Sequence, residues 1–102
     1  MTAAVRLRPE EIAAVKRIFA EHVGPAAEVR VFGNRARPAA RGGDLDLHVL
    51  VPGRAPGWQV EARAGARLEA ALDDLHVDLL LLGSEERPKR IDEVGMATGV
   101  RL

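Results

Sequence analysis

Two segments of the chain carry apolar residues at the spacing of a helix that buries one face. The first begins at Pro9, a residue favoured in the first turn of a helix, and ends before Gly24 and Pro25. Its apolar stripe consists of Ile12, Val15, Phe19 and Val23. The second helix is predicted from Trp58 to Leu75, with the stripe Val60, Ala64, Leu68, Ala71, Leu72 and Leu75.

Three shorter segments have the pattern of β-strands. Residues 28–32 read EVRVF and end at Gly33, and residues 76–82 read HVDLLLL, an apolar run with one carboxylate. Residues 44–51 alternate strictly between two faces. One face holds Leu45, Leu47, Val49 and Val51, and the other holds Asp44, Asp46, His48 and Leu50.

The order of these elements predicts an α+β fold. Residues 34–43 are rich in Gly, Pro and Arg, which favours a loop or a short helical turn, and 52–57 form a second loop. A last helix is expected to open at Pro88 and end at Gly99, with Ile91, Val94 and Ala97 as its apolar residues. We expect residues 1–102 to form one domain: a small mixed sheet of three or four strands with helices packed on one face. The strand–helix–strand unit from 44 to 82 should make a right-handed crossover.

The composition narrows the class of function. Lys and Arg together number 15, as do Asp and Glu, so the net charge is zero and a protein that coats nucleic acid is not expected. There is no cysteine, which excludes disulfides and thiolate metal sites. The aromatic residues are only Phe19, Phe32 and Trp58, too few for a base-stacking surface. We see neither a signal peptide nor a membrane span, and expect a cytoplasmic protein.

Asp44 and Asp46 lie on the same face of their predicted strand, although aspartate is disfavoured in strands. At a rise of about 3.3 Å per residue they stand about 6.6 Å apart. Their repulsion is relieved by water or by a divalent cation that prefers oxygen ligands. A solvated strand face would explain the pair by itself, so the neighbouring features decide between the two interpretations.

Further features converge on this pair. Asp78 interrupts an otherwise apolar strand, where an unpaired carboxylate is costly. If the two strands are neighbours, Asp78 completes a cluster of three carboxylates that is best explained by Mg²⁺. Gly33 allows close approach of backbone to a ligand. Three loop arginines either bind phosphate or are simply solvated: Arg35, Arg37 and Arg41.

The stretch VFGNRARPAARGGDLDLHVLV, followed by HVDLLLL, resembles the signature of minimal nucleotidyltransferases of the polymerase-beta-like superfamily. That signature is a strand, Gly-Ser, a basic spacer, Asp-x-Asp in an apolar strand, and a third aspartate on a later strand. The resemblance covers residues 10 to 102. Two departures stand out: Asn34 replaces the usual Ser, and the nine-residue spacer to Asp44 is one residue short.

The resemblance implies a Mg²⁺-dependent enzyme that transfers a nucleoside monophosphate, in some members AMP from ATP onto a protein hydroxyl. Asp44 and Asp46 would hold the metals that bind the triphosphate. Asp78 would bind the metal at the attacking hydroxyl and help to deprotonate it. Gly33 and Asn34, with Arg35 and Arg37, would bind phosphate. Minimal members of the family are antitoxins whose partner is a HEPN-domain toxin.

The sequence leaves alternative functions open. The chain could be a non-catalytic antitoxin that blocks its partner by binding it, or a nucleotide-sensing regulatory module, with Asn34 marking a decayed site. The nucleotide, the acceptor and the oligomeric state are not specified by the sequence. His22, His48 and His76 show no metal-ligand spacing, so we expect satisfied or exposed side chains at these positions.

Overall fold

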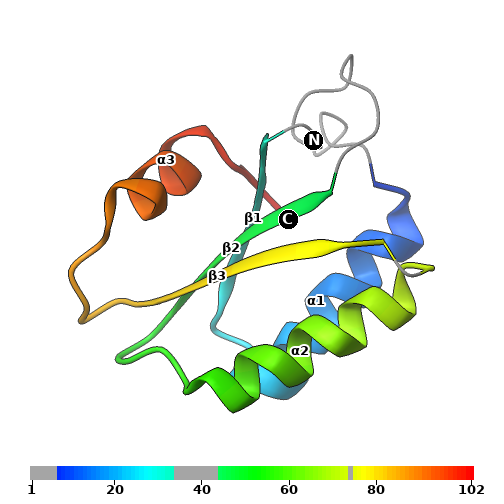
Figure 1. The fold of residues 1–102 in the computed structure, drawn as a ribbon, viewed down its shortest axis with the longest axis horizontal. Helices are drawn as coiled ribbons and strands as arrows, with labels where there is room; N and C mark the ends of the chain where they lie inside the picture. The colour runs from blue at the N-terminus through cyan, green and yellow to red at the C-terminus, as the bar shows by residue number, and fades with distance from the viewer. Residues whose placement is uncertain (1–6, 34–43, 74) are drawn as a thin grey trace.

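A computed structural model describes residues 7–33, 44–73 and 75–102 of the chain. Within them, three helices and four strands follow one another along the chain. Figure 1 shows how the helices lie around the sheet. The elements are α1 (Pro9–Val23), β1 (Glu28–Phe32), β2 (Leu45–Val51), α2 (Trp58–Ala71), β3 (Val77–Gly83), α3 (Arg90–Thr98) and β4 (Val100–Arg101).

The four strands form one mixed sheet in the order β3-β2-β1-β4. β1 pairs antiparallel with both β2 and β4, whereas β2 and β3 pair in parallel. A parallel pair needs a long connection across the sheet, and α2 lies within this one (Figure 1). The α+β class and the mixed sheet predicted from the sequence are confirmed.

The main core lies between the sheet and the pair α1 and α2, which pack beside each other. The apolar face of β2 is buried in it, as the strict alternation of that strand predicted. Fully buried members come from both helices and both central strands: Val15, Phe19, Val31, Leu45, Leu47, Val49 and Leu68. This packing fixes the register of β2, because a shift by one residue would turn its carboxylates into the core.

Helix α3 lies against the opposite face of the sheet, so the expectation that all helices share one face is wrong for this element. His48 points away from the main core and is fully buried beneath α3. Its Nε2 donates a hydrogen bond to Oδ1 of Asp92, over 3.0 Å. Gly95 allows this approach, since a Cβ at that position would lie 3.2 Å from the Cβ of His48.

Several boundaries differ from the predicted ones. α2 ends at Ala71 rather than Leu75, and α3 begins at Arg90, two residues after Pro88. The terminal residues form β4, which pairs with β1 and was not predicted. The loop predicted for residues 34–43 lies outside the described residues. Among the helices that are described, none is long and apolar enough to cross a membrane.

Candidate functional site

The parallel pairing of β2 and β3 brings two aspartates together. Asp46 and Asp78 are register partners, one on each strand. Asp44 lies immediately before β2, on the same face as Asp46. The structure therefore unites the three carboxylates that the sequence predicted as a cluster, at the end of the sheet where β2 and β3 begin.

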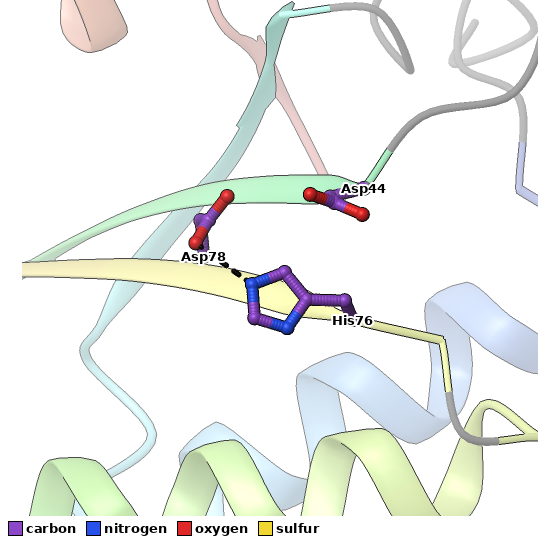
Figure 2. A group of neighbouring side chains, drawn as sticks. All are labelled: Asp44, His76 and Asp78. Carbon is purple, nitrogen blue, oxygen red and sulfur yellow. Dashed lines mark hydrogen bonds and ion pairs between the residues drawn. The ribbon is translucent and has the colours of Figure 1, made fainter.

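Oxygen and nitrogen ligand atoms gather at this end of the sheet (Figure 2). Asp44, His76 and Asp78 each offer one atom that lies within 4.8 Å of the others, and all three residues are exposed. In Figure 2 the carboxylates of Asp44 and Asp78 and the imidazole of His76 approach one another above the starts of β2 and β3. The distances suit side chains that share one small cation.

Asp46 lies deeper in the same cluster and is only partly exposed. Burial raises the pKa of Asp46, and the charge of Asp78, a hydrogen bond shared with Asp78 and the charge of Asp44 raise it further. His76 opposes this shift. Both burial and the nearby carboxylates therefore disfavour the ionised form of Asp46, and a bound divalent cation would favour it.

Gly33 stands beside Asp46, as its predicted role at the site requires. It follows Phe32, the register partner of Asp46, and has a φ of 71°. A Cβ at position 33 would collide with the carboxylate oxygen Oδ2 of Asp46. The left-handed backbone favours glycine here, and a side chain at this position would displace the carboxylate of Asp46.

His76 is absent from the predicted site, yet the structure places it there. Its Nε2 donates to Oδ1 of Asp78 over 3.1 Å, and its Nδ1 lies 3.5 Å from Oε2 of Glu69. The hydrogen bond to Asp78, together with the charges of Asp44 and Asp78, raises the pKa of His76. The sequence feature that could have indicated this placement is the spacing of His76 and Asp78, two residues apart. In a strand this spacing puts both side chains on one face, as it does those of Asp44 and Asp46.

The remaining predicted phosphate-binding residues lie outside the described part of the chain. These are Asn34, Arg35, Arg37 and Arg41. His48 is buried beneath α3 and bonded through Nε2 to Asp92, but its Nδ1 has no hydrogen-bond partner among the described residues, so the expectation of a fully satisfied side chain is only partly met.

The chain matches no model of a known protein family, and no curated protein matches it.

Proposed function

We propose that this protein is a Mg²⁺-dependent nucleotidyltransferase that transfers a nucleoside monophosphate, AMP from ATP, to a hydroxyl of a partner protein. The proposal is supported above all by the register of β2 and β3, which sets Asp78 against Asp46 and close to Asp44. The sequence resemblance supplies the reaction class and the partner. That partner would be a HEPN-domain toxin, which the protein neutralises in the cytoplasm as an antitoxin.

The donor set fits magnesium. Asp44, Asp46 and Asp78 offer carboxylate oxygens, the ligands that this ion prefers, and the pKa of Asp46 is raised first by burial and then by the neighbouring charges of Asp78 and Asp44. These three residues would hold the metal, with the triphosphate providing further oxygens. Bound Mg²⁺ supplies charge neutralisation at the entering and leaving oxygens of a phosphoryl centre.

The chain's own groups have distinct tasks in this reaction. Asp78 is exposed, and its carboxylate accepts the proton that the acceptor hydroxyl loses. The hydroxyl oxygen forms a bond to the α-phosphorus, the bond from that phosphorus to the bridging oxygen breaks, and pyrophosphate leaves. His76 holds Oδ1 of Asp78 by its hydrogen bond and so orients the carboxylate. Gly33, which has no Cβ, leaves room for the carboxylate of Asp46.

Thermal unfolding with and without Mg-ATP tests the site. A ligand that binds only the folded state at ten times its Kd stabilises by about 1.4 kcal/mol, roughly 6 to 11 °C in Tm for a domain of this size. Asp46→Asn should abolish this shift. Glu85→Gln, at an exposed carboxylate past the end of β3 opposite to the cluster, should retain it.

Without metal, the same substitution should act in the opposite direction. Because the pKa of Asp46 is raised in the folded state, its ionisation destabilises the fold as pH rises through that range. Asp46→Asn should therefore raise the Tm of the metal-free protein at neutral pH, and this advantage should fade at acidic pH.

A wild-type protein that shows no shift in Tm at millimolar Mg-ATP would contradict an intact site and favour a non-catalytic binding module.

A further inference from the structure

His76 brings a nitrogen atom to a cluster whose other ligand atoms are carboxylate oxygens. Its ligand atom lies within 4.8 Å of those of Asp44 and Asp78. Figure 2 shows the imidazole and these two carboxylates turned towards one another. The sequence resemblance implies only the three aspartates as metal ligands. The imidazole is therefore an additional donor that belongs to this chain's own version of the site.

Two atoms of the cluster are spaced as neighbouring ligands of one ion. Nε2 of His76 and Oδ1 of Asp78 lie 3.1 Å apart and share a proton in the metal-free protein. Two ligands at about 2.1 Å from an octahedral ion, at right angles to each other, stand about 3.0 Å apart. An ion can therefore take the place of the shared proton, and the imidazole and the carboxylate then stay joined through the ion.

The other ring nitrogen of His76 faces a carboxylate on α2. Nδ1 lies 3.5 Å from Oε2 of Glu69. That oxygen is itself held in place, because it accepts a hydrogen bond from the backbone N–H of Val77 over 3.2 Å. A metal-bound histidine almost always donates its second ring N–H to a carboxylate, a carbonyl or water, which fixes the tautomer and the orientation of the ring. Glu69 occupies this position and leaves Nε2 free to bind a metal.

The backbone on both sides of the imidazole is fixed by the fold. The carbonyl oxygen of His76 accepts a hydrogen bond from the N–H of Leu45 over 2.9 Å, which extends the pairing of β2 and β3 to the cluster. Glu69 follows Leu68, which is fully buried in the core, and α2 packs against β3. The nitrogen ligand and its carboxylate partner are thus supported by rigid elements, as a metal site requires.

We propose that His76 binds the metal of this site through Nε2, that Glu69 positions its ring, and that the nitrogen ligand makes the site prefer Mn²⁺ to Mg²⁺. Mg²⁺ is bound in proteins by oxygen ligands, whereas first-row transition ions also bind imidazole, and Mn²⁺ shares the carboxylate ligands of Mg²⁺. This inference rests on the proposed function, for which it specifies the ion at the nucleotide site.

Pulsed EPR of bound Mn²⁺ tests the ligand directly and needs neither ATP nor a partner protein. A directly bound imidazole nitrogen modulates the electron spin echo, and oxygen ligands do not. We expect this nitrogen modulation in the wild-type protein and its loss in His76→Gln. His22→Gln is the matched control and should keep the modulation, because His22 lies just before β1 begins and the cluster adjoins the end of β1.

The affinities for the two ions separate a ligand from a counter-charge. Titrated without nucleotide, His76→Gln should bind Mn²⁺ at least about tenfold more weakly, and Mg²⁺ less than about threefold more weakly. A histidine that only neutralises Asp78 would compete with either ion. Its replacement would then strengthen the binding of both ions or leave it unchanged, and that result would overturn the inference.

Glu69→Gln tests the positioning role. It should weaken Mn²⁺ binding about tenfold, the lower end of the effect of removing such a partner, while the nitrogen modulation remains. Glu61→Gln, at a partly exposed carboxylate two turns earlier on the same helix, should change the affinity by less than about twofold. Equal Mn²⁺ affinities of the two variants would exclude the role of Glu69.

The outcomes distinguish this inference from the proposed function. Stabilisation by Mg-ATP in a wild-type protein that binds no Mn²⁺, or binds it without nitrogen modulation, would overturn the inference and leave the proposed function intact. Nitrogen modulation that depends on His76, without transfer of a nucleotide to the partner protein, would support His76 as a ligand and contradict the proposed function instead.

Discussion

At the scale of single residues, Gly33 and Gly53 share a backbone conformation but differ in what surrounds them. Their φ angles are 71° and 77°. A Cβ at Gly53 would meet no atom within 4 Å, whereas one at Gly33 would collide with Asp46. Alanine substitutions at the two glycines therefore distinguish two effects on stability: the free-energy cost of a left-handed backbone, and the cost of displacing the Asp46 carboxylate.

We expect Gly53→Ala to lower the free energy of unfolding by about 1 kcal/mol, the cost of the left-handed conformation for a residue with a Cβ. Gly33→Ala should lower it further and also remove the stabilisation by Mg-ATP, because the new methyl group displaces the Asp46 carboxylate. Urea unfolding with and without Mg-ATP measures both effects. Retention of the Mg-ATP shift in Gly33→Ala, with the same loss of stability as in Gly53→Ala, would exclude a role for Gly33 at the site.

The face of Asp46 and the exceptional position of Asp78 were predictable from the sequence, whereas their meeting and the surroundings of the histidines depend on which elements pack together. Alternation within one strand gives the face of Asp46, and a costly charge in an apolar run marks Asp78. The burial of His48 depends on α3, an element distant in sequence. The placement of His76 depends on the register between β2 and β3, which short-range pattern does not specify.

At the scale of elements, α3 is held to the sheet by a polar contact. Its side chain Asp92 joins the buried His48 to the backbone N–H of Lys89 at the start of the helix. The apolar residues Ile91 and Val94 remain exposed instead of packing against the sheet. The predicted apolar stripe of this helix is thus not its buried face, because a histidine–aspartate pair and Gly95 form the contact.

Asp92→Ala should lower the free energy of unfolding by about 2–3 kcal/mol. The substitution leaves a buried imidazole N–H without an acceptor and removes the cap of α3. Glu93→Ala, at an exposed residue of the same turn, should change it by about 0.5 kcal/mol or less. Denaturant unfolding measures both.

A double-mutant cycle tests the assignment of this cost to the pair. His48→Leu introduced into Asp92→Ala should cost little more, because no unpaired buried donor then remains. Equal stability of Asp92→Ala and Glu93→Ala would show that the hydrogen bond contributes nothing.

Element boundaries were predicted correctly where a residue such as proline or glycine marks the start or the end of the element. Pro9 and Gly24 bound α1 as expected. At α2, Leu72 and Leu75 continue the apolar spacing and still pack on the core, but the backbone leaves the helix at Leu72, and Asp73 has a φ of 56°. Apolar periodicity reports burial, and burial here extends beyond the helix. The short strand β4 has no pattern of its own and forms because β1 offers a free edge.

At the scale of the whole molecule, both faces of the sheet are used. One face builds the core with α1 and α2, which fixes the register that brings Asp46 to Asp78. The other face carries the acidic cluster and, next to it, a groove beside α3. The acidic cluster is thus positioned by the same strand pairing that the core fixes.

The proposed reaction is tested most directly by following the α- and γ-phosphates of ATP separately. The protein is incubated with its HEPN-domain partner, Mg²⁺ and ATP labelled on either the α- or the γ-phosphate, and the partner is then analysed for label and added mass. We expect the α-label and the mass of AMP on the partner, with pyrophosphate released. Asp46→Asn should still bind the partner but transfer no label. Transfer of the γ-label, or neutralisation of the partner by wild type and Asp46→Asn alike without added mass, would contradict nucleotidyl transfer.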